Sequence, residues 1–453
     1  MELSLNEVLE ATAGKVIVEG KKDFNKICID TRKIEVNNLY LAINGERFNG
    51  NKFVGDAFEK GASVAIVDEV LFNIEDLKDF GTVIKVVNSE KALLDLASFY
   101  RKKLGIKVVG VTGSCGKTST KDLIAAFLSD KYKVFKTKGN FNNQIGLPLM
   151  ILELDNSYDV AVLEMGMSNL GEIDVLANCA RPDIAVITNI GLSHIENLKT
   201  QDNILKAKSE IFNYFDENNT LIINGEDTNL LKIKNKCFEI LRIGYNHEYD
   251  VYAYNIILKE DNTSFTVKAK EDEFNFKIPM AGKHNVLNSM LAIAVAKKLN
   301  VSFSEMEKGI KNLEATSMRL QVIKKEDLTI INDCYNASPD SMKSSIDVLN
   351  SYKDGRKIAI LGTMNELGDE SINAHTDVGY YAKGKIDLLI AIGQYKDCYK
   401  KGYSLDNIIT FENKEDFIKN LNNIIKRNDV ILVKASRGMK FEEIVSSLEE
   451  VQI

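Results

Sequence analysis

The sequence predicts an α/β protein of three domains, in which parallel strands alternate with helices. Its 453 residues exceed the length of one ordinary domain, so two or three domains are expected. Apolar strands alternate with amphipathic helical segments over two long stretches, which indicates parallel sheets with crossover helices. A glycine-rich loop near residue 110 joins one such strand to a helix, the context in which phosphate-binding loops occur.

Residues 1–85 are predicted to form a small first domain. Its apolar runs at 38–43 and 62–67 are expected to be buried strands, and a polar loop from Gly45 to Asn51 lies between them. Residues 86–315 are predicted to form a central domain with a parallel sheet. Its expected strands are 106–109, 160–163, 184–188 and 221–224, and its expected helices are 89–103, one from residue 117, and 281–299.

Residues 316–453 repeat this alternation and are predicted to form a Rossmann-like, doubly wound domain. Its expected strands are 328–331, 357–361, 388–392, 407–411 and 430–433, and its clearest amphipathic helices are 340–349 and 414–425.

Composition excludes several classes of protein. A net charge of -7 argues against a broad nucleic-acid-binding surface. Residues 1–7 lack the basic leader of a secretory signal, and no apolar stretch approaches the roughly 18 residues of a membrane span. The six cysteines are scattered without paired spacing, which favours reduced thiols over disulfides or a zinc site. We therefore expect a cytoplasmic protein that does not insert into membranes.

The phosphate loop is the strongest single motif, GVTGSCGKTST at 110–120. Its glycines let backbone N–H groups turn toward phosphate oxygens, and the helix that follows adds its positive end. Lys117 would bridge the β- and γ-phosphates, and the Thr118 hydroxyl would hold magnesium. Val111 stands where the common pattern has glycine, so the alternative is a glycine-rich turn without nucleotide. The Gly-Lys-Thr sequence between strand and helix favours nucleotide binding.

ATP is favoured over GTP, because the segment NKCF at 235–238 lacks the aspartate of a guanine-reading motif. Glu164 follows an apolar strand, where a carboxylate is placed to bind magnesium directly or through water. The alternative for Glu164 is a solvent-facing side chain at the end of a strand.

Five further segments and the phosphate loop resemble, in order, the signature motifs of the Mur ligase family. The loop TGSCGKT at 112–118 carries the family's offset glycine. The others are NFNNQIGLP at 140–148, EMG at 164–166, NIGLSH at 189–194, GKHNVLN at 282–288 and Arg319. The similarity covers essentially the whole chain.

Two segments resemble the family member that adds D-alanyl-D-alanine: DCYNASPDSM at 333–342, and GTMNELG at 362–368 followed by His375. The third-residue-adding member would show Asp-Tyr-Ala-His where 335–337 reads Tyr-Asn-Ala. Thr363 stands where the family usually has Asp, and Asn49 and Asn51 stand where Asp and His are common. These departures concern substrate contacts more than the reaction class.

The resemblance implies an ATP-dependent ligase that joins D-alanyl-D-alanine to a UDP-N-acetylmuramoyl-tripeptide through an acyl phosphate. It implies a monomer whose first domain binds the UDP sugar, and it leaves the third acceptor residue open between diaminopimelate, lysine and others. The expected nucleotide contacts are Thr112, Gly113, Ser114, Cys115, Gly116, Lys117, Thr118, Asn285, Arg319 and Asp333. The expected substrate contacts are Thr31, Arg32, Asn44, Gly45, Arg47, Asn143, Asn336, Ser338, Asn365, Glu366 and His375.

The resemblance also implies two magnesium ions and the catalytic residues Lys117, Glu164, His194 and Lys208, with Thr118 as a further metal ligand. From the residues alone, His194 is more often structural than a ligand, and Lys208 reads as a solvated helical lysine. The family carries a carbamylated lysine at the position of Lys208, which converts a cation into an anionic magnesium ligand. We therefore predict this modification of Lys208.

Three other functions remain as alternatives: a Mur ligase that adds another amino acid, a folylpolyglutamate enzyme, and a P-loop protein that binds ATP without ligation. A folylpolyglutamate enzyme should lack a separate UDP-binding domain, and the segment 30–50 argues against it. A protein that only binds ATP would have no need of Lys117, Glu164 and His194 together, and all three are present.

Overall fold

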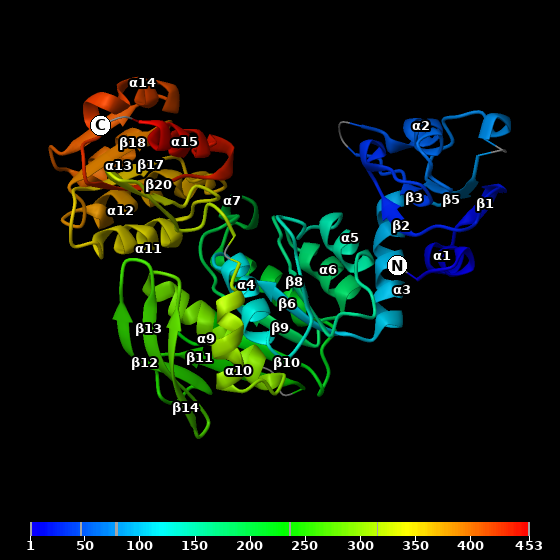
Figure 1. Ribbon diagram of the computed structural model, residues 1–453, viewed down its shortest axis with the longest axis horizontal. Helices are drawn as coiled ribbons and strands as arrows, with labels where there is room; N and C mark the ends of the chain where they lie inside the picture. The colour runs from blue at the N-terminus through cyan, green and yellow to red at the C-terminus, as the bar shows by residue number, and fades with distance from the viewer. Residues whose placement is uncertain (1, 46–47, 78–79, 235–236, 315, 452–453) are drawn as a thin grey trace.

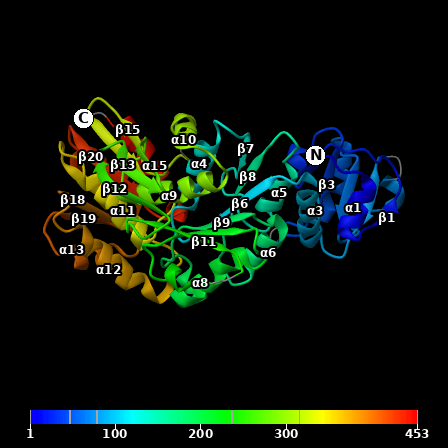
Figure 2. The ribbon, with the colours of Figure 1, turned by 90° about the horizontal axis from the view of Figure 1, so that it is seen from below.

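The computed structural model describes residues 2–45, 48–77, 80–234, 237–314 and 316–451. They form three sheets of five, nine and six strands, which follow one another along the chain. The N-terminal and C-terminal sheets lie at opposite ends of an elongated molecule, with the nine-stranded sheet between them (Figures 1 and 2). This confirms the predicted three-domain α/β class; the boundaries at 85/86 and 315/316 stay predictions, and residue 315 lies outside the described residues.

The N-terminal sheet has the strand order β1-β5-β4-β3-β2, and only β1 runs antiparallel to its neighbour. The strands are β1 Lys15–Val18, β2 Lys26–Cys28, β3 Asn38–Leu41, β4 Val64–Val67 and β5 Thr82–Lys85, and the helices are α1 Leu5–Thr12 and α2 Val54–Glu59. The two predicted strands are β3 and β4, which are buried along their whole length. Central parallel strands lose solvent on both faces, so their sequences are continuously apolar and easily recognised.

The central sheet has the order β14-β13-β12-β11-β10-β9-β6-β8-β7. Its parallel part contains β6 Lys107–Thr112, β7 Val134–Lys136, β8 Val160–Glu164, β9 Ile184–Ile187, β10 Thr220–Asn224 and β11 Glu239–Gly244. Its helices are α3 Ser89–Leu104, α4 Lys117–Leu128, α5 Gly146–Leu152, α6 Glu172–Ala180, α7 Ile195–Leu198, α8 Gln201–Ser209, α9 Lys283–Lys298 and α10 Phe303–Gly309. Helix α9 is buried on nearly all sides between α4 and the strands, which explains its weak amphipathic pattern.

One edge of the central sheet differs from the parallel sheet that the sequence predicts. β12 Val251–Leu258 is parallel to β11, but β12, β13 Thr263–Ala269 and β14 Asp272–Ile278 form an antiparallel meander. The connections between these three strands contain no helix, so the chain reverses direction at each turn. Apolar side chains of the meander, among them Phe265, Phe274 and Phe276, pack in an aromatic cluster with Phe303 of α10.

The C-terminal sheet has the order β15-β16-β20-β17-β18-β19 and is parallel except for β15. The strands are β15 Gln321–Lys324, β16 Leu328–Asn332, β17 Lys357–Leu361, β18 Leu388–Ile392, β19 Ile408–Phe411 and β20 Asp429–Lys434. The helices are α11 Pro339–Asn350, α12 Ser371–Ala382, α13 Lys396–Tyr403, α14 Lys414–Ile424 and α15 Glu442–Glu450. All five predicted strands are present, and β15 was not predicted.

The carboxyl ends of β6, β9 and β16 bring predicted motifs of two domains together. The loop after β6 enters α4, the loop after β9 enters α7, and the loop after β16 enters α11. Figure 1 shows α4 and α7 of the central domain facing the C-terminal domain, far from the N-terminal sheet. Among the described residues, no helix is both long and apolar enough to cross a membrane.

Candidate active site

The phosphate loop has the backbone geometry that its glycines predict. Gly113 and Gly116 have φ of 146° and 81°, in the region that side chains disfavour. A Cβ at Gly113 would lie 1.8 Å from Thr188 Oγ1, and one at Gly116 would lie 2.7 Å from Asn288 Oδ1. Neither position therefore accepts a side chain without moving the loop. Gly116 is the N-cap of α4, so Lys117 and Thr118 begin the helix.

The NIGLSH motif after β9 holds the phosphate loop from one side. The Ser114 and Cys115 backbone N–H groups donate to the backbone oxygen and to Oδ1 of Asn189, at 3.0 and 2.9 Å. The Gly191 N–H donates in return to Ser114 Oγ at 2.9 Å. The two motifs are thus one hydrogen-bonded unit, which fixes the loop before any ligand binds.

Glu164 and Thr118 form the best-defined candidate magnesium site. Glu164 is 3% exposed, so the solvent-facing alternative is wrong. Its two carboxylate oxygens accept hydrogen bonds from Thr118 Oγ1 and Asn142 Nδ2, both at 2.9 Å, and its N–H donates to Thr137 Oγ1. These partners are neutral, so none of these three contacts is an ion pair that competes with a bound cation.

Lys117 lies above this pair, with its Nζ donating to Gly113 O at 2.8 Å. Burial lowers the pKa of Lys117, and the Arg319 guanidinium contributes to that lowering while the Glu164 carboxylate opposes it. Arg319 belongs to the segment that enters the C-terminal domain, so two cations from different parts of the chain act on one space. Such a pair suits a polyphosphate.

Lys208 is buried, contrary to the interpretation of the residue as a solvated lysine. It is 2% exposed on α8 and has no carboxylate within ion-pair distance among the described residues. Burial, reinforced by the Lys117 charge, lowers its pKa well below the ordinary value for lysine. An amine held in this way is biased toward its neutral, nucleophilic form.

His194 meets the C-terminal domain directly. Its Nδ1 lies 2.5 Å from Glu366 Oε2, and the Glu196 N–H donates to Glu366 O at 3.2 Å. The hydrogen bond from His194 lowers the pKa of Glu366. A predicted metal-binding residue and a predicted dipeptide-binding residue therefore lie in contact, although they come from different domains.

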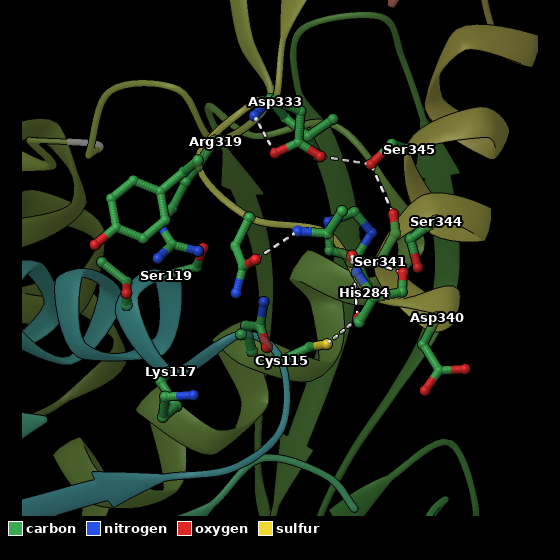
Figure 3. Close-up of a pocket in the computed structure, with 18 of the residues that line it drawn as sticks. Cys115, Lys117, Ser119, His284, Arg319, Asp333, Asp340, Ser341, Ser344 and Ser345 are labelled. Carbon is green, nitrogen blue, oxygen red and sulfur yellow. Dashed lines mark hydrogen bonds between the residues drawn. The ribbon is translucent and has the colours of Figure 1, made fainter. Parts of the chain in front are cut away.

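A pocket opens between the phosphate loop, the start of α9 and the C-terminal domain (Figure 3). In Figure 3, Lys117 and Cys115 lie on the wall opposite Arg319 and Asp333. The Arg319 guanidinium stacks 4.3 Å from the Tyr335 ring, and its buried Nε has no hydrogen-bond partner among the described residues. The predicted nucleotide residues from Ser114 to Thr118, together with Asn285, Arg319 and Asp333, all line this pocket.

Asp333 and Asn285 have well-defined partners at the pocket wall. Asp333 accepts hydrogen bonds from Leu320 N–H and Ser345 Oγ and pairs with Lys434 Nζ at 2.5 Å. Asn285 donates to Ala281 O at 2.8 Å and accepts from Asn288 Nδ2 at 3.0 Å. Both side chains are thereby held in one orientation toward the pocket.

Helix α11 directs its N-terminus at the phosphate loop. Ser338 caps the helix, Pro339 occupies its first turn, and Ser338 Oγ lies 2.9 Å from Cys115 Sγ. Asn336 lines the same pocket, and its backbone oxygen accepts from Lys434 Nζ at 3.1 Å. Two of the predicted dipeptide residues are therefore beside the nucleotide pocket, whereas Asn365 lies outside it and is held by Ser436 Oγ.

The structure corrects the role of His375 and refines those of Asn143 and Thr112. His375 is 0% exposed; its Nε2 accepts from Met364 N–H at 2.9 Å and its Nδ1 contacts Ser371 O. With both ring nitrogens engaged in the core, it has no access to the dipeptide. Asn143 Oδ1 accepts from Gly146 N–H at the start of α5, and the Thr112 hydroxyl donates to Met165 O, so both side chains support the fold.

The predicted UDP-sugar residues lie in the N-terminal domain, apart from the pocket. Arg32 is 86% exposed and forms a bidentate pair with Asp30, while Thr31 begins the same short 3-10 turn. Asn44 Nδ2 donates to Glu69 Oε1, and Gly45 N–H donates to Phe48 O. Arg47 lies outside the described residues.

Several residues of the site were not selected from the sequence. Asn142 contacts Glu164, and Asn189, His284 and Lys434 line or support the pocket. Burial lowers the pKa of His284 to about 4. Asn142, Asn189 and His284 lie within the motifs already quoted, so those motifs could have identified them as site residues. Lys434 ends an apolar strand, and no motif marks it.

Comparison with known proteins matches all three parts of the chain to one family. Residues 23–101 match the Mur ligase family catalytic domain, 111–296 the Mur ligase middle domain, and 318–437 the Mur ligase glutamate ligase domain.

Relatives and solved structures extend over nearly the whole chain. The UDP-N-acetylmuramoyl-tripeptide–D-alanyl-D-alanine ligase of Bacillus subtilis is 41% identical over 431 residues, covering 94% of this chain and 93% of that protein. A crystal structure of MurF from Acinetobacter baumannii has a TM-score of 0.91 at 29% identity, with 99% of both chains covered. The structure of MurF ligase from Thermotoga maritima in complex with ADP has a TM-score of 0.83 at 29% identity, covering 94% and 97%.

Proposed function

Because the chain belongs to the Mur ligase family, we infer that the pocket between its central and C-terminal domains is where ATP activates a carboxylate for amide formation. The chain is an ATP-dependent ligase that joins D-alanyl-D-alanine to UDP-N-acetylmuramoyl-tripeptide, in peptidoglycan precursor synthesis. The observation that carries the site assignment is that Lys117 and Arg319, from two domains, line one pocket.

The reaction has two displacements. A carboxylate oxygen of the tripeptide attacks the γ-phosphorus of ATP and ADP leaves, which gives an acyl phosphate. The dipeptide amine then attacks the acyl carbon, loses a proton, and phosphate leaves. Each displacement accumulates negative charge on phosphoryl oxygens, so positioning and positive charge are what the protein has to supply.

The chain supplies that charge from three directions. The N–H groups at the start of α4 face the phosphates, Lys117 stands over the loop, and Arg319 closes the pocket from the C-terminal side. Tyr335 orients Arg319 by stacking, and the fixed Asn285 and Asp333 would hold adenine and ribose. We propose these as the nucleotide contacts.

We propose that magnesium is held by Thr118 and Glu164 at one position and by His194 and Lys208 near a second. Such an ion would take much of its coordination from phosphate and water. Bound magnesium would neutralise the phosphoryl oxygens. Burial and the Lys117 charge lower the pKa of Lys208. The lowered pKa supports carbamylation, because a neutral amine is the form that adds carbon dioxide.

We propose that the N-terminal domain binds the UDP sugar through Thr31, Arg32, Asn44, Gly45 and Arg47. We propose that Asn336, Ser338, Asn365 and Glu366 line the dipeptide site; Ser338 and Glu366 support this because both contact the central domain beside the phosphate loop. We further propose a cytoplasmic monomer.

The test measures phosphate release by the purified chain with ATP, a UDP-N-acetylmuramoyl-tripeptide and D-alanyl-D-alanine. Release should require both substrates, and Lys117→Ala should abolish it. Phosphate release that does not depend on either substrate would contradict the proposed ligase activity. Acceptors with diaminopimelate or lysine at the third position, assayed side by side, identify the residue that the enzyme prefers.

A further inference from the structure

We propose that Asp122 and Thr316 form a fixed pivot for the C-terminal domain and thereby position Arg319 against the phosphate loop. Neither residue lines the pocket, so the role is one of positioning. The inference rests on the proposed nucleotide site, and it adds two residues that act on that site by positioning Arg319.

Asp122 lies on α4, five residues beyond Lys117, and is 4% exposed. Its Oδ2 accepts a hydrogen bond from Thr316 Oγ1 at 2.7 Å. Its Oδ1 lies 3.2 Å from Lys136 Nζ and 3.4 Å from Lys121 Nζ. A buried carboxylate is rarely retained without partners, and here its only hydroxyl donor among the described residues comes from the segment between two domains.

The segment that leads to the C-terminal domain is tied to α4 and its surroundings at three successive points. Asn312 Nδ2 donates to Ser129 Oγ at 3.2 Å, just beyond the end of α4. Glu314 lies 3.7 Å from Lys136, which also pairs with Asp122. Thr316 makes the last of these contacts, and the C-terminal sheet begins at Gln321.

Arg319 follows the pivot after three residues, which span at most about 10 Å of extended chain. The backbone on both sides of Arg319 is constrained: Met318 and Leu320 have φ of 60° and 50°, and Leu320 N–H is held by Asp333 Oδ1 at 3.1 Å. Rotation of the C-terminal domain about Thr316 would therefore keep Arg319 within reach of the loop.

Helix α4 consequently serves both ends of the site. Its N-terminus presents Lys117 and Thr118, and its next turn holds Thr316 through Asp122. A helix is rigid over one or two turns, so α4 sets the separation between Lys117 and Arg319, the two cations that face the phosphates. Loss of the Thr316 hydroxyl would release Arg319 from that constraint while leaving the phosphate loop intact.

The experiment compares Thr316→Val with Thr316→Ser and Ser317→Ala in the full-length chain. Valine keeps the shape of threonine but cannot donate, serine restores the hydroxyl, and Ser317 is an exposed neighbour without a hydrogen bond among the described residues. ADP affinity is measured by calorimetry and thermal stability by scanning calorimetry. Steady-state kinetics then give KM for ATP and kcat for phosphate release.

Thr316→Val should weaken ADP binding and raise KM for ATP about 5- to 10-fold, the scale of one ordinary hydrogen bond. Thr316→Ser and Ser317→Ala should stay within about twofold of the unmodified chain. In an Arg319→Ala background, Thr316→Val should add no further loss, because its effect passes through Arg319.

ADP affinity within twofold of the unmodified chain in Thr316→Val would overturn the pivot, as would an undiminished effect in the Arg319→Ala background. A lower melting temperature with unchanged ADP affinity would assign Thr316 a purely structural role and would also overturn it. Since ADP binding needs neither peptide substrate, the pivot can hold even if the chain fails to ligate D-alanyl-D-alanine, which would contradict the proposed function alone.

Discussion

His194 Nδ1 of the central domain lies 2.5 Å from Glu366 Oε2 of the C-terminal domain. The Glu366 backbone oxygen also accepts the Glu196 N–H, and Gly368 packs against Glu196, so the contact involves backbone as well as side chain. A carboxylate on one ring nitrogen of a histidine sets the tautomer and orientation of the ring. Glu366 is thus placed to orient His194 only when the two domains are together.

Glu366→Gln should therefore lower kcat by about 10- to 100-fold, the usual cost of losing a partner that orients a metal-binding histidine. ADP affinity without magnesium should change little, because Glu366 does not line the nucleotide pocket. Glu370→Gln, an exposed neighbour, is the matched control. Equal kcat in both variants would remove Glu366 from the mechanism.

Glu164→Gln should abolish magnesium-dependent turnover while the chain stays folded. The glutamine oxygen can still accept from Asn142 Nδ2 and its amide N–H can donate to the Thr118 hydroxyl, but the side chain lacks the charge that a divalent cation requires. Binding of Mn²⁺ with ADP, followed by electron paramagnetic resonance, should weaken by at least about 10-fold. Glu153→Gln, at an exposed glutamate of the same domain, should bind Mn²⁺ as the unmodified chain does.

Lys208→Ala should nearly abolish turnover, and a short carboxylate such as acetate should partly restore it. The buried cavity left by the side chain can admit the anion that a carbamate would supply. Mass spectrometry under native conditions should show one added carbon dioxide on the unmodified chain and none on the variant. Lys206→Ala, exposed on the same helix, serves as the control, and full activity of Lys208→Ala would end the carbamate proposal.

Protonation of His375 at acid pH should loosen the nearby loop that carries Glu366. Burial lowers the pKa of His375 from 6.5 to about 4, so the folded state holds the neutral ring. The unfolded chain binds the proton first as pH falls; stability from this group is complete above pH 6.5 and is lost toward pH 4. The difference between the unfolded and folded pKa of His375 corresponds to about 3 kcal/mol of unfolding free energy.

The Met364 amide reports this loss, because it donates to His375 Nε2 and a protonated ring cannot accept. Its hydrogen-exchange protection, corrected for the intrinsic rate, should fall between pH 6.5 and 4. In His375→Gln that pH dependence should be reduced. A slope that is unchanged by the substitution would assign the acid sensitivity to other groups.

Sequence patterns alone were enough to predict the local structural elements of this protein. Apolar runs predicted the buried parallel strands, and Gly113 and Gly116, which adopt positive φ, predicted the turn that precedes Lys117 and Thr118. These features depend on a few neighbouring residues, so they can be recognised without knowing the rest of the fold. The meander at β12–β14 was missed because alternating, half-exposed strands give a weaker signal than continuous apolar ones.

Which side chains meet, and which are buried, depends on how distant segments pack together. Cys115 and Ser338 are 223 residues apart and Asp122 and Thr316 are 194 apart, so no local pattern predicts either contact. The burial of Lys208 and the enclosure of His375 likewise depend on which elements pack around them. Helix propensity and apolar pattern act over a few residues, whereas desolvation and ion pairing act wherever folding places two groups together.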